Sequence, residues 1–113
     1  MNLNEINFSL SIYKIDLNIC QYTCYSSQYD TPIGFVWVRF ESGEHGKKKA
    51  NILNCYTVEW ARRSGVCRFL YNCVRDHSDI MVTNIGSDSG GRNFLENYGF
   101  KYVEDTMTWA FKK

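Results

Sequence analysis

The chain has 113 residues, of which 44% are hydrophobic and 16% aromatic, and its formal net charge is +1 at pH 7. This composition predicts one packed domain over residues 1–113, excludes a disordered chain, and gives no reason to expect general attraction to nucleic acid or membranes. No apolar run is long enough to cross a membrane, and the first residues lack the charged and apolar segments of a secretory signal. The five cysteines are odd in number, which favours reduced thiols in a cytoplasmic protein over a disulfide framework.

The first half of the chain predicts strands joined by short turns. Apolar and polar residues alternate from Phe8 to Tyr13, which is typical of a half-buried strand. Only the four residues 14–17 separate this run from the next, so the sequence predicts a tight hairpin without a helix. The strands predicted in this half cover residues 8–13, 18–25, 34–40 and 51–58, with an exposed loop at 42–49.

The second half predicts two helices and three more strands. After residue 65, apolar side chains recur at the spacing of one helical face, at Val66, Phe69, Leu70, Cys73 and Val74. A fifth strand is expected at 80–85 and a short helix at 92–98, and the chain closes with a hairpin of strands at 100–103 and 107–111.

The turn between the fourth strand and the first helix predicts an anion site. Its sequence, Arg62-Arg63-Ser64-Gly65-Val66-Cys67, combines basic residues with a glycine at the start of a helix. The first turn of a helix carries N–H groups without internal partners and the positive end of the helix dipole. Because glycine has no side chain, a phosphate can approach those N–H groups closely. We therefore expect a phosphate-bearing ligand at residues 62–68.

The same six residues resemble the acyl-CoA-binding motif of the GNAT N-acetyltransferase superfamily, Q/R-x-x-G-x-G/A. Arg62 and Gly65 match the motif, whereas Cys67 stands where the family has Gly or Ala. Residues 87–100, a short helix that closes in Gly-Phe, resemble the family's second signature. The resemblance covers about residues 33–113 and implies an α+β fold with a GNAT-like mixed, mostly antiparallel sheet of six to seven strands and two helices.

The resemblance implies acetyl-CoA as cosubstrate and acetyl transfer to an amine. In the family, the backbone of the fourth strand pairs with the pantetheine arm, and the N–H groups of the following turn hold the pyrophosphate. Asp88 falls where the second signature often has Asn. The residues that the resemblance assigns to acetyl-CoA are Cys55, Tyr56, Thr57, Arg62, Arg63, Ser64, Gly65, Val66, Cys67, Arg68 and Asp88.

The catalytic acid is where this sequence departs from the family. Leu95 occupies the place of the usual Tyr and cannot donate a proton. Tyr98 lies close to the same helical face and is the candidate acid, with a core position beside Phe94 as the preferred alternative. Glu59 and Tyr56 are candidate bases at the end of the fourth strand, and a relay of water molecules is the alternative to both.

Two functions of different classes follow from this reading. The family usually carries two helices between its first two strands, and their loss here predicts an open site suited to a macromolecular acceptor, protein or RNA. The alternative is a catalytically silent GNAT-fold protein that binds and modulates a partner protein. No spacing predicts a metal site, and the lysines at 47–49 are expected to be solvated rather than bound to RNA. An open sheet edge and the aromatic strand Trp109–Phe111 leave room for a homodimer.

Overall fold

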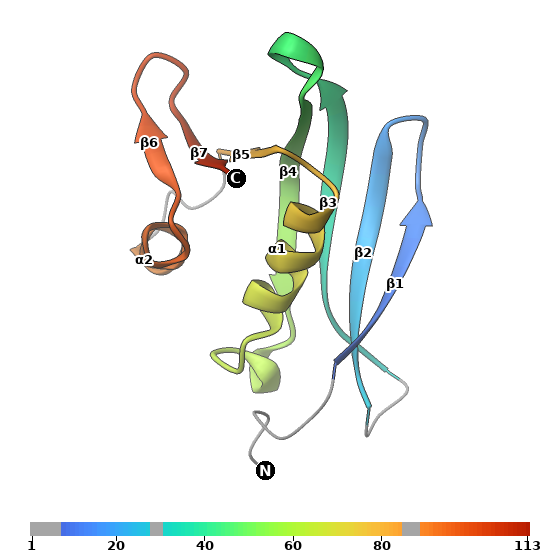
Figure 1. Ribbon diagram of the computed structural model, residues 1–113. Coiled ribbons are helices and arrows are strands. Elements are labelled where there is room, and N and C mark those ends of the chain that lie inside the picture. The colour runs from blue at the N-terminus through green and yellow to red at the C-terminus, as the bar shows by residue number, and fades with distance from the viewer. Residues whose placement is uncertain (1–7, 28–30, 85–88) are drawn as a thin grey trace.

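A computed structural model describes residues 8–27, 31–84 and 89–113. Seven strands and two α-helices form an α+β domain, with one short 3-10 turn before the fourth strand and another after it (Figure 1). The elements in chain order are β1 (Phe8–Lys14), β2 (Ile19–Ser26), β3 (Pro32–Ser42), η2 (Glu44–Gly46), β4 (Lys48–Thr57), η3 (Glu59–Ala61), α1 (Val66–Asp76), β5 (Ile80–Thr83), α2 (Ser89–Tyr98), β6 (Lys101–Val103) and β7 (Thr108–Lys112).

The strands make one mixed sheet in the order β1-β2-β3-β4-β5-β7-β6. Each neighbouring pair is antiparallel except β4 and β5, which are parallel because α1 connects them. The predicted strands and helices are confirmed, with differences at their ends, such as the start of α2 at Ser89 rather than at residue 92. β4 begins at Lys48, inside the predicted loop 42–49, because Lys48 and Lys49 pair with Ser42 and Glu41. β5 ends at Thr83 rather than at residue 85, which lies outside the described residues.

The connection between β1 and β2 is the predicted tight hairpin. Lys14 pairs with Cys20, and the Ile15 N–H donates to the Ile19 carbonyl at 2.9 Å. Leu17, at the tip of the turn, is 82% exposed. The prediction that no helix lies between the first two strands is therefore confirmed.

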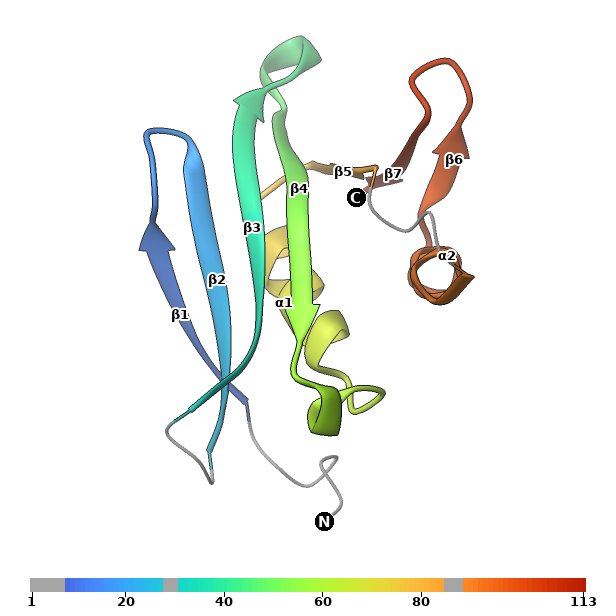
Figure 2. The same cartoon turned by 180° about the vertical axis from the view of Figure 1, so that it is seen from behind.

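Helix α1 covers one face of the sheet and closes the core. Its buried side is formed by Val66, Leu70, Tyr71 and Val74. These side chains pack against buried residues of the central strands, which include Val36, Val38 and Ile52. Seen from behind, β3 and β4 lie in front of α1 with β2 and β1 beside them, and no helix of the described residues covers that side (Figure 2). One face of the sheet is thus built for packing and the other is open.

Helix α2 and the strands after it form a second, aromatic part of the core. The helix ends at Gly99, whose φ of +118° is in the left-handed region, and the Phe100 N–H donates back to the Leu95 carbonyl at 2.9 Å. The Phe111 ring lies 5.7 Å from that of Phe100, measured between centroids. Because β7 pairs with β5 on one side and β6 on the other, the strand Trp109–Phe111 is not an edge strand. The outermost strands of the described sheet are β1 and β6, and a homodimer stays a prediction.

None of the helices in the described part of the chain is both long and apolar enough to span a membrane.

Candidate active site

The sheet opens into a fork where β4 and β5 part. The two strands pair from Lys49 to Ile52, and the Thr83 hydroxyl donates to the Ile52 carbonyl at 3.2 Å in the last pair. β4 continues to Thr57, whereas β5 turns toward β7 (Figure 1). Within residues 8–27, 31–84 and 89–113, no strand pairs with this last part of β4 on the side away from β3. An extended ligand can therefore meet the backbone of β4 there.

A β-bulge in β4 decides which side chains face this opening. Asn54 pairs with Trp37 and Ile52 with Val38, so Leu53 is an extra residue on β4. The extra residue reverses the alternation of inward and outward side chains. Cys55 consequently faces α1, where its Sγ lies 3.4 Å from that of Cys67.

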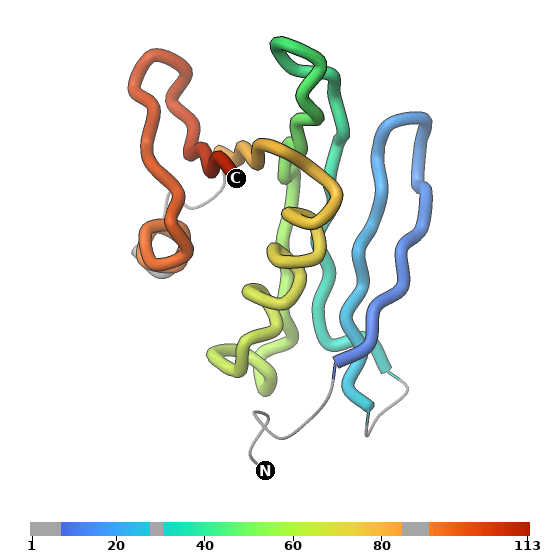
Figure 3. Tube along the Cα trace, in the orientation of Figure 1, coloured from blue at the N-terminus to red at the C-terminus, as the bar shows by residue number. Residues whose placement is uncertain are grey.

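The turn from η3 into α1 has a strained backbone and an uncapped helix start. Arg63 (φ +65°) and Gly65 (φ +90°) are both in the left-handed region, which costs a non-glycine residue roughly 1–2 kcal/mol. Gly65 is the N-cap and supplies no side-chain cap, and the first turn of α1 contains no acidic residue. The N–H groups and the positive dipole of this helix end are thus left for a ligand, as expected from the sequence. Figure 3 shows this turn at the end of α1 next to the end of β4.

Three arginines make the opening electropositive. Arg62 Nε donates to the Thr57 carbonyl at 3.2 Å, which holds its guanidinium beside the end of β4. The Arg68 guanidinium lies over the Tyr98 ring, 5.2 Å from the centroid. All three side chains, Arg63 included, are exposed and line one cavity. An anionic ligand would meet charge-assisted hydrogen bonds on this side.

The cavity has a volume of about 780 Å³ and lies between the end of β4, the start of α1 and α2. It brings together nine of the eleven residues that the sequence assigns to the cofactor. Ser64 is outside the lining, and its hydroxyl donates to the Ala61 carbonyl within the turn. Asp88 lies outside the described residues. The lining consists of Cys55, Tyr56, Thr57, Ala61, Arg62, Arg63, Gly65, Val66, Cys67, Arg68, Tyr71, Gly91, Phe94, Leu95 and Asn97.

Tyr98, the candidate acid, lies beside this cavity but not in its lining. Its side chain is 8% exposed, and its hydroxyl donates to Asn72 Oδ1 at 2.7 Å. Burial raises the pKa of the Tyr98 phenol above its ordinary value. These contacts favour the core position named as the alternative, while a role as acid stays a prediction. Leu95, by contrast, lines the cavity directly.

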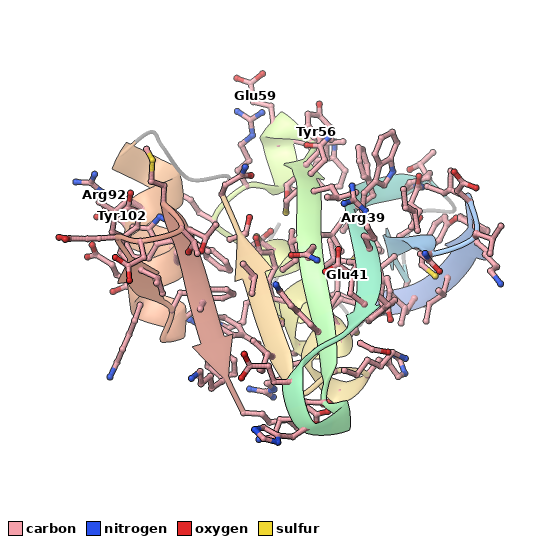
Figure 4. The ribbon with its side chains drawn as sticks, turned by 90° about the horizontal axis from the view of Figure 1, so that it is seen from above. Arg39, Glu41, Tyr56, Glu59, Arg92 and Tyr102 are labelled. Carbon is pink, nitrogen blue, oxygen red and sulfur yellow. The ribbon has the colours of Figure 1, made fainter. Side chains whose placement is uncertain are left out.

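The two candidate bases lie at the end of β4 and beyond it. Tyr56 lines the cavity, but its ring is 47% exposed and packs 5.8 Å from that of Phe35, measured between centroids. Glu59 is on η3, and its side chain extends away from the body of the molecule (Figure 4). Glu59 does not line the cavity, so the fold does not bring it to the ligand side of Tyr56.

Two features of the cavity were not predicted from the sequence. Tyr71 is 1% exposed on α1 and contributes to the lining, and burial raises the pKa of its phenol well above the ordinary value. The spacing of Cys67, Tyr71 and Val74, at i, i+4 and i+7, would have placed it on the buried face of the helix. The contact between Cys55 and Cys67 depends on the bulge in β4, and no pattern in the sequence predicts that bulge.

No protein-family model matches the sequence, and no curated protein matches it. Solved structures with the same arrangement do exist. Naa50 from Arabidopsis thaliana, in complex with the bisubstrate analogue CoA-Ac-MVNAL, superposes with a TM-score of 0.62 and 19% identity over 74% of this chain. The PaiA N-acetyltransferase from Thermoplasma acidophilum, in complex with coenzyme A, superposes with a TM-score of 0.69 and 18% identity over 86% of this chain. NAA60 from Arabidopsis thaliana, in complex with acetyl-CoA, superposes with a TM-score of 0.64 and 17% identity over 78% of this chain.

These likenesses show the fold of the chain. The strand and helix order, the parallel pair β4–β5 and the connection through α1 are those of the GNAT-type fold, as the sequence resemblance predicts. The chain spans 58% of the length of the Naa50 chain and 62% of that of the PaiA chain.

Proposed function

We propose that the chain binds acetyl-CoA in the cavity at the fork and transfers the acetyl group to an amine. The observation that carries this proposal is the fork itself. The unpaired side of β4 ends beside the uncapped N-terminus of α1, so a single extended ligand meets strand backbone at one end and helix N–H groups at the other. A pantetheine arm that ends in a pyrophosphate has this combination of amide groups and negative charge.

Each part of acetyl-CoA has partners in the cavity. The backbone from Cys55 to Thr57 would pair with the amides of the pantetheine arm, as one more strand beside β4. The N–H groups at Val66 and Cys67 and the three arginines would hold the pyrophosphate. Charge-assisted hydrogen bonds of this kind contribute about 1.5–3 kcal/mol each. Asp88, assigned to the same ligand by resemblance, completes the proposed set.

The transfer depends mainly on positioning. The amine must reach the thioester carbonyl after it has lost a proton, and a lysine amine has a pKa of about 10.4 in water. The cavity lining of the described residues contains no aspartate, glutamate or histidine. Proton removal therefore passes through water or through a phenol such as Tyr56, and rate enhancement comes from holding the two reactants together.

We propose a macromolecular acceptor because the acceptor side is open. The β1–β2 connection is a four-residue turn without helices, and the face of β1–β4 behind α1 has no helical cover in the described residues (Figure 2). The Naa50 structure contains a peptide-like bisubstrate analogue, and a NatC complex bound to a Gag peptide and CoA shares the fold, with a TM-score of 0.59. These neighbours favour a protein over RNA. The five free thiols suit a reducing compartment, so we place the reaction in the cytosol.

The second candidate is a silent GNAT-fold protein that binds a partner protein. The observation that favours it is Leu95 in the cavity wall, where a phenolic acid would serve the leaving thiolate.

Calorimetric titration with acetyl-CoA, followed by mass spectrometry of co-expressed cellular proteins for new acetyl marks, separates the two candidates. Binding together with new marks supports the transferase. Binding without marks, or a stable partner without binding, supports the silent protein and contradicts the proposed activity.

A further inference from the structure

The wall of the cavity contains two thiols that the proposed transfer does not use. Cys55 comes from β4 and Cys67 from the first turn of α1, so only the tertiary fold brings them together. Both side chains line the cavity and both are half-buried, so a small solute in the cavity can reach either sulfur. The cavity thus presents a dithiol beside the proposed binding site of acetyl-CoA.

The two sulfurs form a close pair. Their Sγ atoms are 3.4 Å apart, within hydrogen-bonding distance for sulfur. All five cysteines lie in the described part of the chain, and this is the one sulfur–sulfur contact among them. Because the S–S distance of a disulfide is about 2.05 Å, a short approach of the two side chains is enough to form one. The pair is therefore placed for closure to a disulfide.

The surroundings of the pair favour its reaction with an oxidant. A thiol reacts with peroxide as its thiolate, and positive charge nearby favours that form. Three exposed arginines, Arg62, Arg63 and Arg68, line the same cavity, and the described lining contains no carboxylate. The contact between the sulfurs acts in the same direction, because an S–H that donates to the other sulfur stabilises a thiolate there, whichever of the two keeps the proton. The pair therefore becomes reactive after the loss of one proton.

We propose that Cys55 and Cys67 form an oxidation site, and that peroxide converts them to a disulfide that weakens the binding of acetyl-CoA. The proposal rests on the proposed binding of acetyl-CoA in this cavity. In the first step one sulfur, as a thiolate, attacks a peroxide oxygen, the O–O bond breaks, hydroxide leaves, and a sulfenic acid forms. In the second step the other sulfur attacks the sulfenic sulfur, the S–S bond forms, and the S–O bond breaks with loss of hydroxide. The two protons released by the thiols convert both hydroxides to water, so the dithiol loses two electrons and one peroxide gains them.

The disulfide would change the part of the site that the phosphates need. It would enclose residues 56–66 in a covalent loop, and this segment contains the turn with Arg63 and Gly65 in left-handed conformations. Cys67 contributes its N–H as well as its thiol to the first turn of α1, so a movement of its sulfur toward β4 also shifts N–H groups proposed for the pyrophosphate. Hydrogen bonds weaken steeply outside a narrow range of distance and angle. The oxidised protein should therefore bind acetyl-CoA more weakly, and a thiol reductant should restore binding.

The test compares the reduced protein with protein treated with an equimolar amount of hydrogen peroxide. Peptide mapping without reductant locates any cross-link, and calorimetric titration measures the affinity for acetyl-CoA. Acetyl-CoA is the titrant because its sulfur is acylated, whereas the free thiol of CoA would itself reduce a disulfide. We expect a disulfide between Cys55 and Cys67, an affinity lower by roughly tenfold, as for the loss of one charge-assisted hydrogen bond, and reversal of both changes by dithiothreitol. Thermal unfolding should show that the oxidised protein stays folded.

Two variants separate the disulfide from other effects of peroxide. Cys55→Ser cannot form the cross-link, so its affinity for acetyl-CoA should not show the tenfold fall after treatment. Cys73→Ser changes a half-buried thiol of α1 outside the cavity and keeps the pair, so it should respond to peroxide like the parent protein. A Cys55→Ser variant that loses affinity on treatment as the parent does would contradict the role of the disulfide.

The titrations also distinguish a failure of this proposal from a failure of the proposed function. Reduced protein that binds acetyl-CoA, but forms no cross-link between Cys55 and Cys67, contradicts the oxidation site and leaves the proposed function standing. Cross-linked protein with unchanged affinity likewise contradicts the effect of oxidation on binding. Reduced protein that binds no acetyl-CoA contradicts the proposed function, and the regulation of binding falls with it.

Discussion

The hydroxyl of Tyr98 donates to Asn72 Oδ1 at 2.7 Å and so ties the end of α2 to the middle of α1. The Tyr98 ring is also packed against Tyr71, Phe100 and Phe111, with centroid distances of 5.3 to 5.7 Å. A phenol held in this way stabilises the contact between the two helices and has its proton already engaged. These contacts favour the core position that the sequence analysis preferred for Tyr98, and they add a hydrogen bond to Asn72 that the sequence did not predict.

Replacing Tyr98 with Phe should lower stability and leave turnover unchanged. Loss of one half-buried hydrogen bond, with Asn72 left unpaired at that atom, costs about 1 kcal/mol. Urea denaturation and initial rates with acetyl-CoA measure the two effects, and Tyr102→Phe, on an exposed side chain of β6, is the matched control. A steep fall in kcat at unchanged stability would instead identify Tyr98 as the acid.

Replacing Gly65 with Glu should abolish acetyl-CoA binding. The Cβ meets nothing within 4 Å in the protein, so the added carboxylate occupies the cavity and repels the phosphates. The strain of a side chain at φ +90° also acts on the fold, and Gly46→Glu controls for it, since Gly46 has φ +73° and lies outside this cavity. Calorimetry should show loss of binding for the first variant only. Equal affinities would mean that the turn at 62–67 is not the phosphate site.

Replacing Arg62 and Arg63 with Gln should weaken binding of acetyl-CoA much more than binding of S-acetyl-pantetheine, which has no phosphates. Each lost charge-assisted hydrogen bond costs about 1.5–3 kcal/mol, roughly a ten- to hundredfold change in affinity. Arg39→Gln, on β3 beside Glu41, removes the same charge away from the cavity and should change neither. A parallel loss for both ligands would show that the arginines support the turn rather than bind phosphate.

The rate at which iodoacetamide alkylates the native protein should depend on pH differently for each thiol. Because the contact with Cys67 lowers the pKa of Cys55, Cys55 keeps its reactivity as the pH falls below the ordinary thiol pKa. Cys24 is fully buried, and burial raises its pKa to about 12, so Cys24 should react more slowly than Cys55. Removing this contact with Cys67→Ala raises the pKa of Cys55 and should move its rate profile to higher pH. An unmoved profile would show that the two sulfurs do not share a proton.

Replacing Gly34 with Ala should destabilise the protein by about 1–3 kcal/mol through overpacking. A Cβ at Gly34 would lie 2.6 Å from Val66 Cγ1 and 2.9 Å from the Tyr56 carbonyl oxygen, so α1 could no longer approach β3 as closely. The double variant with Val66→Ala removes the side-chain clash and should recover part of the loss, measured by thermal unfolding. If the double variant recovers no stability, the loss comes from the clash with the Tyr56 carbonyl oxygen alone.

The sequence by itself determined the local elements and the basic, glycine-containing turn before α1. Period-two and period-3.6 patterns depend only on neighbouring residues, so the strands around Phe8 and Gly34 and the helix from Val66 could be predicted. The turn before α1 could be predicted for the same reason, because its glycine and arginines are neighbours in the sequence.

Only the tertiary structure decided which side chains from different strands and helices are in contact. The bulge at Leu53 is a matter of pairing between β3 and β4, and a shift of one residue there turned Cys55 toward Cys67. The contact from Tyr98 to Asn72 likewise depends on how α2 packs against α1. Such contacts between distant residues are fixed by packing and strand register, which no local pattern records, and they decide which side chains meet around the cavity.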